Sequence, residues 1–213
     1  MSLPETTLML IRHGETEWNR DRRFQGHGDS PLTAKGQAQT DALGKRLAAV
    51  PFDRLVSSDM GRTQATAAII AGHTGHAIQT DPRLRERHYG VLEGLNIQEI
   101  RRDHAAVYAQ LITEDPDFTI PGGQSHRQHY RAGIDFLESW LDAHPGQTAA
   151  VVSHGGFLDN VFRYIAGLKL GAPRCVLAGN SSLSIIVHGQ FYGSARWIIR
   201  SWGDEGHLAG ATP

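Results

Sequence analysis

Two histidines occupy matching places in this sequence, each directly after an apolar stretch and directly before a glycine. The stretch LMLI leads into Arg12 and His13, and the stretch TAAVV leads through Ser153 into His154. Arginine and histidine are costly to bury without partners, so their position at the end of an apolar stretch needs a chemical reason. A neutral imidazole can supply one, because it can attack as a nucleophile or accept a proton.

A third apolar stretch adds a second arginine to this group. The sequence SSDMGRT places Arg62 at the predicted start of a helix. In open α/β sheets, ligands bind just outside the carboxyl ends of the strands, so side chains from several strand ends can meet in one pocket. Two guanidinium groups suit phosphate oxygens, and a nearby helix N-terminus adds to the attraction. The sequence therefore predicts a phosphate dianion site with a nucleophilic imidazole inside it, formed by Arg12, His13, Arg62 and His154.

The predicted elements follow one another in the order that such a site requires. Apolar segments and helical periodicity alternate along the chain. Strands are predicted at residues 7–11, 52–58, 148–156, 181–190 and 195–202, with one more opening the segment 77–95; helices are predicted at residues 32–50, 61–72, 96–113, 125–144 and 156–168. This alternation predicts an α/β fold, a three-layer sandwich whose mostly parallel central sheet is flanked by helices, as one domain over residues 1–213.

The composition excludes several classes of partner. The 213 residues carry 21 basic and 22 acidic side chains, which gives a net charge of −1. The sequence therefore has no excess of positive charge that would favour binding to nucleic acid or an anionic membrane. No apolar run approaches the ~18 residues of a membrane span. The N-terminus has no signal-peptide pattern, and the single Cys175 forms no internal disulfide, so we expect a cytoplasmic protein. The sequence leaves the oligomeric state open, a homodimer included.

Other arrangements of these residue types point elsewhere. His126 and His129 lie three apart on a predicted helix, a spacing that permits a metal, but no carboxylate accompanies them at helical spacing. We therefore predict no metal site. Ser153 and His154 form no catalytic pair, because neighbouring strand residues point to opposite faces. Glycine-rich loops for dinucleotides or nucleoside triphosphates are absent, and we expect no resident cofactor.

Six ordered motifs resemble one known family. LIRHGETEWN, RFQGHGDSPLTAKGQAQ, SSDMGRTQATA, LRERHYGVLEGL, PGGQS and VVSHGG follow the order of the histidine phosphatase superfamily, which is also called phosphoglycerate mutase-like. The resemblance runs from about residue 7 to residue 165, and the C-terminal stretch WIIRSWGDEGHL resembles the shorter phosphatase-type members. It implies a phosphoglycerate mutase-like α/β sandwich in which the first motif supplies a histidine that carries a transient phosphoryl group.

The resemblance also implies a role for individual residues. His13 is the implied nucleophile, Glu86 is the implied proton donor, and the charge of the phosphoryl group is bound and neutralised by Arg12, Arg62 and His154. Further phosphate or substrate contacts are implied at Asn19, Gln25, Gly26, Tyr89 and Gly155.

The chemistry is consistent with these roles. His13 must be neutral to attack phosphorus, and nearby cations lower its pKa. Phosphoryl transfer depends on alignment and charge balance, which two arginines and a protonated His154 can provide without a metal. The leaving alkoxide needs a proton, which Glu86 can donate if its pKa is raised; Glu15 is a weaker candidate. Water then attacks the phosphohistidine, which completes hydrolysis through a covalent intermediate.

Three functions share these residues. A phosphomonoesterase is the favoured one, because Ile97 follows Asn96 where the mutase pattern has a substrate-holding lysine, and the insertion that closes the mutase site is missing. Arg101 and Arg102 form a pair that we place on a solvated helix face. A phosphoglycerate mutase, which would need 2,3-bisphosphoglycerate as cofactor, is the alternative. A non-catalytic protein that binds phosphorylated ligands is least supported, because every reactive group is present. We expect residues 95–124 to select the substrate.

Overall fold

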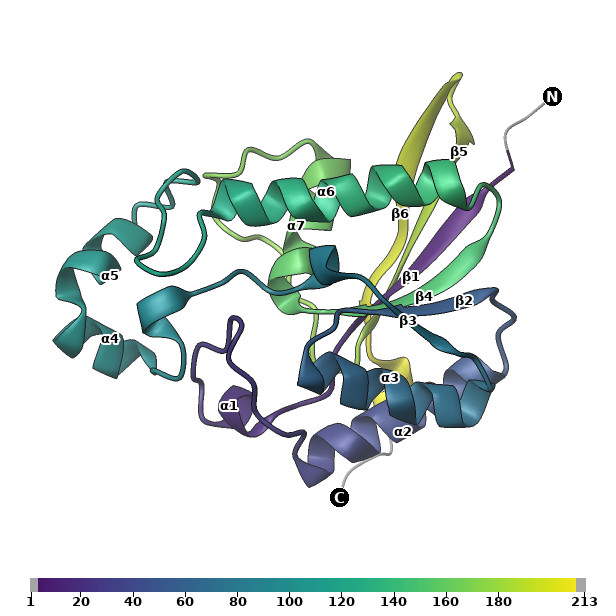
Figure 1. Cartoon of the computed structure of the whole chain (residues 1–213). Helices are drawn as coiled ribbons and strands as arrows, with labels where there is room; N and C mark the ends of the chain where they lie inside the picture. The colour runs from purple at the N-terminus through teal and green to yellow at the C-terminus, as the bar shows by residue number, and fades with distance from the viewer. Residues whose placement is uncertain (1–3, 210–213) are drawn as a thin grey trace.

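A single mixed sheet forms the centre of the molecule. The computed structural model describes residues 4–209, so the outermost residues of the domain predicted over 1–213 lie outside the described range. The sheet has six strands in the order β3-β2-β4-β1-β5-β6 (Figure 1). Their bounds are Thr6–Arg12 for β1, Arg54–Ser57 for β2, Ile78–Thr80 for β3, Thr148–Ser153 for β4, Leu183–Phe191 for β5 and Ser194–Asp204 for β6.

The strand directions place the sequence motifs at one edge of the sheet. β3, β2, β4 and β1 are parallel, whereas β5 pairs antiparallel with both β1 and β6. In the β1–β4 register Arg12 lies opposite Ser153, so His13 and His154 leave the sheet at the same level on adjacent strands. The predicted α/β fold with a mostly parallel sheet is confirmed.

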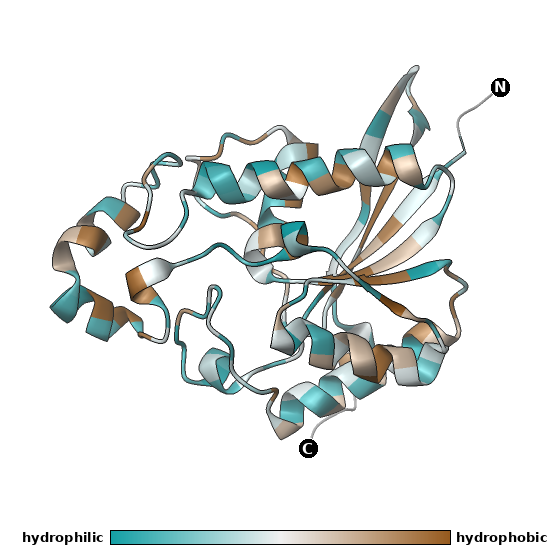
Figure 2. Cartoon of the chain, in the orientation of Figure 1, coloured by the Kyte–Doolittle hydropathy of each residue, from teal (hydrophilic) through white to brown (hydrophobic). Residues whose placement is uncertain are grey.

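Helices cover both faces of the sheet (Figure 1). α2 (Ala34–Ala48) and α3 (Gly61–Thr74) pack on one face, where Leu43, Leu47 and Ile70 are fully buried against strand residues such as Leu55. α6 (His126–Ala143) and α7 (Gly155–Ala166) cover the other face. The apolar strand residues between the two layers form the brown centre of Figure 2. Burial of about 1.5–3 kcal/mol per large apolar side chain holds this sandwich rigid beneath the strand ends.

A third, smaller apolar cluster lies outside the sandwich. The helix predicted over residues 96–113 is in fact two helices, α4 (Ile97–Asp103) and α5 (Ala105–Leu111), because His104 leaves the helical conformation with φ −132° and ψ 41°. The break lets both short helices turn apolar residues toward one small core. Its buried members and the side chains packed on them are Leu92, Ile100, Ile120, Phe24, Tyr89, Leu95, Val107, Tyr108, Leu111 and Phe118.

Short elements complete the chain. The sequence analysis missed α1 (Glu17–Arg20), which is stabilised by reciprocal side-chain hydrogen bonds between Thr16 and the third helical residue, Asn19. The segment predicted to open with a strand at residue 77 contains only β3 and two 3-10 turns, η1 (Pro82–Leu84) and η2 (Gly90–Leu92); a third, η3 (Gly206–Leu208), follows β6. Among residues 4–209 no helix has the length and apolar character needed to cross a bilayer.

Candidate active site

A small pocket lies at the carboxyl ends of β1 and β4. We call it the phosphate pocket; its volume is about 150 Å³. It contains every residue that the sequence predicted for the site except His154, which lies directly behind it. The residues that line it are Arg12, His13, Asn19, Arg23, Gln25, Gly26, Arg62, Glu86, Tyr89, Gly155, Gly156 and Arg174.

His13 is held with one ring nitrogen available. Its amide donates to Ser153 O at 3.0 Å, which fixes the turn after β1. Its Nδ1 lies 2.8 Å from the carbonyl oxygen of Gly14, and a carbonyl only accepts, so Nδ1 carries the proton and Nε2 keeps its lone pair. Burial, followed by Arg62 and Arg12, holds the pKa of His13 well below its usual range. The ring is therefore neutral and keeps its lone pair at Nε2, the state that the predicted nucleophile requires.

The two arginines are held by backbone carbonyls. Arg62, with a side chain only 1% exposed, donates from Nη1 to Gly28 O and from Nη2 to Gly26 O, both at 2.8 Å. Arg12 donates from Nη1 to Ala178 O at 2.8 Å. The Nε atoms of both guanidiniums are buried without a partner among residues 4–209. Because a buried unpaired donor is costly, these atoms mark where an anion would bind.

His154 is neutral, which differs from the protonated state expected for it. The residue precedes α7, is fully buried and places Nε2 3.0 Å from Ser58 Oγ. Burial, then Arg62 and His13, hold the pKa of His154 well below its usual range. Its Nδ1 is buried without a partner in the described part of the chain. If the Ser58 hydroxyl donates to Nε2, Nδ1 carries a proton that can be donated to a phosphoryl oxygen.

Glu86 is held against the N-terminus of α7. Its Oε2 accepts from the amide of Gly156 at 3.0 Å, and its Oε1 accepts from the amide of Arg87 at 2.9 Å. Burial raises the pKa of Glu86, whereas the charge of His129 when it is protonated, these two amides and Arg62 lower it, so the net shift is downward. The raised pKa that the sequence analysis required is therefore wrong for the unliganded protein, in which Glu86 is ionised.

Glu15 lies outside the phosphate pocket. Its carboxylate accepts from Thr33 Oγ1 at 2.9 Å and from Lys35 Nζ at 3.0 Å at the start of α2. This structural role removes Glu15 as a proton donor and leaves Glu86 as the only carboxylate among the residues that line the pocket.

The remaining predicted contacts also line the phosphate pocket. Asn19 Oδ1 accepts from the amide of Thr16 and from Asn180 Nδ2, both at 3.2 Å, so its amide nitrogen is left as a donor in the pocket. Gly26 has a φ of +55°, and a Cβ there would contact the Glu93 carboxylate and lie 2.9 Å from the amide nitrogen of Tyr89. Only glycine therefore fits at this position. Gln25 and Gly155 line the pocket as predicted.

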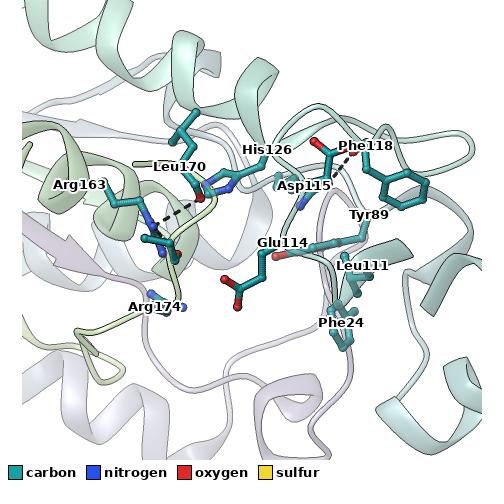
Figure 3. A pocket seen from close by; sticks show the side chains of 12 residues that line it. Phe24, Tyr89, Leu111, Glu114, Asp115, Phe118, His126, Arg163, Leu170 and Arg174 are labelled. Carbon is teal, nitrogen blue, oxygen red and sulfur yellow. Dashed lines mark hydrogen bonds between the residues drawn. The ribbon is translucent and has the colours of Figure 1, made fainter. Parts of the chain in front are cut away.

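A larger chamber adjoins the phosphate pocket and shares Tyr89 and Arg174 with it. We call it the outer chamber; its volume is about 470 Å³. Figure 3 shows an aromatic and aliphatic side, a basic side, and Glu114 between them. Its lining residues include Phe24, Tyr89, Leu111, Phe118, Arg87, His126, Arg163, Arg174, Glu114 and Asp115.

Three lining residues of the phosphate pocket were missed by the sequence analysis. Arg23 and Gly156 fall inside the quoted motifs RFQG and VVSHGG, so those motifs carried a signal for them. Arg174 lies in an irregular segment after α7 without periodicity, where it donates from Nη2 to Gly155 O at 2.6 Å. Its charge contributes to lowering the pKa of Arg12, and its Nε lies 3.4 Å from Asp159 Oδ1.

His126 and His129 have hydrogen-bond partners other than a metal. His126 Nε2 lies 2.8 Å from Asn160 Oδ1, and His129 Nε2 lies 2.9 Å from Arg85 O. Among residues 4–209, no three His, Cys, Asp or Glu side chains are grouped in a way that could hold a metal ion.

Comparisons with known proteins agree with this geometry. The sequence profile of the histidine phosphatase superfamily (branch 1) matches residues 8–205. "Probable phosphoglycerate mutase GpmB" of Cronobacter sakazakii is 38% identical over 202 residues, which is 94% of each chain. The structure of Bacillus stearothermophilus YhfR has a TM-score of 0.85 and 33% identity, covering 95% of this chain and 99% of its own. Mycobacterial glucosyl-3-phosphoglycerate phosphatase, solved with VO3, has a TM-score of 0.80 and 27% identity, covering 92% of this chain and 98% of its own.

The fold and the site define a class of α/β protein in which a neutral, buried histidine is surrounded by arginines at the strand ends. The chain belongs to the histidine phosphatase superfamily, branch 1.

Proposed function

We propose that this protein is a phosphomonoesterase that acts through a phosphohistidine at position 13. One observation carries the proposal: His13 offers an unprotonated Nε2 beside the half-buried Arg12 and the buried Arg62, whose buried Nε atoms have no partner within residues 4–209. A phosphate dianion would satisfy those donors, and its phosphorus would then face the nucleophile. Charge balance and alignment, the two requirements of phosphoryl transfer, come from the chain's own side chains.

In the first half of the reaction, His13 Nε2 attacks phosphorus while the bond to the ester oxygen breaks. Arg12, Arg62 and the Nδ1 proton of His154 bind the equatorial oxygens. Glu86, which lines the phosphate pocket, transfers a proton to the leaving alkoxide. Because Glu86 is ionised before substrate binds, that proton enters with the substrate monoanion and passes to the carboxylate, whose pKa rises beside the resulting dianion.

In the second half, water replaces the alcohol. Glu86, now ionised, accepts a proton from the water as its oxygen attacks the phosphohistidine. Phosphate leaves and His13 returns to its neutral form. The outer chamber supports this step, because it is large enough to release an alcohol and admit water.

A phosphoglycerate mutase remains the second candidate, because the relatives with 38–39% identity carry that name. The residues after Asn96 argue against it. Ile97 is exposed at the start of α4, Arg101 donates to Tyr108 Oη, and Arg102 pairs with Asp103. None of these side chains lines the phosphate pocket or the outer chamber, so none is placed to hold the carboxylate of phosphoglycerate.

Two measurements test the proposal. Enzyme quenched in alkaline denaturant should carry a base-stable, acid-labile phosphate that is absent from His13→Ala. With 3-phosphoglycerate and catalytic 2,3-bisphosphoglycerate, the protein should form little 2-phosphoglycerate compared with its phosphatase turnover on the best ester of a phosphomonoester panel. A phosphate label that persists in His13→Ala would show that His13 is not the nucleophile. Isomerisation of phosphoglycerate that is faster than hydrolysis would show that the protein is a mutase.

A further inference from the structure

Two buried side chains, His129 and Asn160, and the half-buried His126 connect the outer chamber to the backbone beside Glu86. His129 Nε2 lies 2.9 Å from Arg85 O, the carbonyl that immediately precedes Glu86. His129 Nδ1 lies 3.1 Å from Asn160 Nδ2, and Asn160 Oδ1 lies 2.8 Å from His126 Nε2. His129 is 4% exposed and Asn160 is fully buried, whereas His126 lines the outer chamber.

The direction of every hydrogen bond in this chain follows from its inner end. Arg85 O can only accept, so His129 Nε2 donates, and a neutral His129 then has a lone pair at Nδ1. Asn160 Nδ2 must donate to that lone pair, which turns its Oδ1 toward His126. His126 Nε2 therefore donates in turn. One backbone carbonyl thus selects the tautomer of both histidines and the orientation of the amide between them.

The neutral state of His129 is consistent with its surroundings. Burial lowers the pKa of His129, opposed by Glu86. The other groups that face it are the Arg85 carbonyl, His126 and Arg87. A single tautomer of a buried ring, bonded at both nitrogens, has little freedom to rotate, so it holds its backbone partner firmly.

The Arg85 carbonyl belongs to the peptide bond that joins Arg85 to Glu86, so its position sets the direction of the Glu86 side chain. Glu86 follows Arg85 directly, and its carboxylate must remain in reach of both the Gly156 amide and the leaving oxygen. A displacement of about 1 Å at a reacting group can cost roughly 10²-fold in rate. Asn160 belongs to α7, the same helix that holds the Glu86 carboxylate at its N-terminus, so both supports of Glu86 are tied to one element.

We propose that His129 is a positioning residue for Glu86. Asn160 fixes His129 in its donating tautomer, and His126 continues the hydrogen-bond chain from Asn160 to the outer chamber. The inference rests on the proposed function, because it assigns His129 to the proton-transfer step of that reaction. His129 touches no reacting atom and acts only through the peptide before Glu86.

The test compares two substrates that differ in their need for a proton. β-Glycerol phosphate has a poor alkoxide leaving group, whereas p-nitrophenyl phosphate leaves with little help. His129→Phe, which fills the space without a donor, should lose about 10–10²-fold in kcat on β-glycerol phosphate and less than about threefold on p-nitrophenyl phosphate. His129→Gln, whose amide can still donate to Arg85 O, should recover most of the loss. Asn160→Leu keeps the His129 ring but no longer fixes its tautomer. It should also lower kcat more on β-glycerol phosphate than on p-nitrophenyl phosphate, by a smaller factor than His129→Phe.

One control variant and two contrary outcomes separate failure of this inference from failure of the proposed function. His188→Phe is a similar replacement on β5, away from both cavities, and it should leave kcat unchanged on both esters. Equal losses on both esters in His129→Phe and Asn160→Leu, or no recovery in His129→Gln, would overturn the inference and leave the phosphatase in place. A wild-type protein that releases phosphate from neither ester would overturn the proposed function and the inference together.

Discussion

Glu86 decides the proton balance of the site. Its side chain is half-buried, and its carboxylate accepts from two backbone amides and lines the phosphate pocket. The sequence motif indicated a carboxyl at this position, but it could not indicate its ionisation. That property depends on which amides the fold brings to it, and the N-terminus of α7 lies 70 residues further along the chain.

Glu86→Gln should slow the hydrolysis of an alkyl phosphate by about 10²–10⁴-fold, the usual worth of a general acid. The amide keeps the shape of the side chain but has no proton to transfer. With p-nitrophenyl phosphate the penalty should shrink, because that leaving group needs little protonation. Steady-state kcat on both esters checks this, and equal penalties would take the acid role from Glu86.

The pH dependence of kcat/KM on an alkyl phosphate should place the optimum on the acidic side. The lowered pKa of His13 keeps the nucleophile neutral, so the acid limb should lie well below pH 6.5. The lowered pKa of Glu86 means that the proton must arrive with the substrate monoanion. A phosphomonoester loses that proton at a pKa of about 6, so kcat/KM should fall above it. An acid limb at pH 6.5 or higher would show that His13 is not held neutral.

At the scale of elements, the N-terminus of α7 is the part that combines binding and catalysis. The helix begins directly after His154, and its second residue donates to Glu86. Gly156 has no side chain because that space is taken: a Cβ there would collide with the Glu86 carboxylate. The second glycine of the motif HGG is therefore required by the position of the acid.

Gly156→Ala should lower kcat on an alkyl phosphate by roughly 10²-fold, since it displaces Glu86 from its amide partner. Gly72→Ala provides the matched control, because a Cβ at that exposed helical position meets nothing within 4 Å. The control should retain full activity and raise the free energy of unfolding by about 0.5–1 kcal/mol, the difference in helix propensity. Kinetics and urea unfolding of both variants check the pair. Full activity in Gly156→Ala would mean that Glu86 tolerates displacement.

The sequence predicted elements best where periodicity was long and packing was simple. The helices of the sandwich and the strands beneath the site were all predicted, because each presents a regular apolar face to the sheet. The region 96–113 was predicted as one helix because its local pattern is helical throughout. The break at His104 comes from the separate cluster around Ile100, a tertiary effect that periodicity does not encode. Arg174 was missed for a similar reason, since only folding brings it to the pocket.

At the scale of the whole molecule, α4 and α5 form a unit that can respond separately from the sandwich (Figure 1). Ile100→Ala should remove about 2–5 kcal/mol from the packing of this unit. Hydrogen exchange should then increase in α4 and α5 while the amides of β1 and β4 stay protected. Activity should fall more for bulky esters than for small ones, because Tyr89 and Phe24 belong to the same cluster and line the outer chamber. Uniform exchange across the chain would show that the unit and the sandwich unfold together.

The phosphate pocket draws its residues from the end of β1, from α1, from the N-termini of α3 and α7, and from three loops. No fragment of the chain contains enough of them to bind an anion, so the ligand's affinity belongs to the fully folded state alone. Inorganic phosphate should therefore stabilise the entire fold against unfolding, because it binds only the native state. At 100 times its Kd it should add about 2.7 kcal/mol to the free energy of unfolding and raise Tm by roughly 5–10 °C. Arg62→Met should abolish that concentration-dependent shift, whereas a shift that persists in this variant would mean that phosphate binds elsewhere.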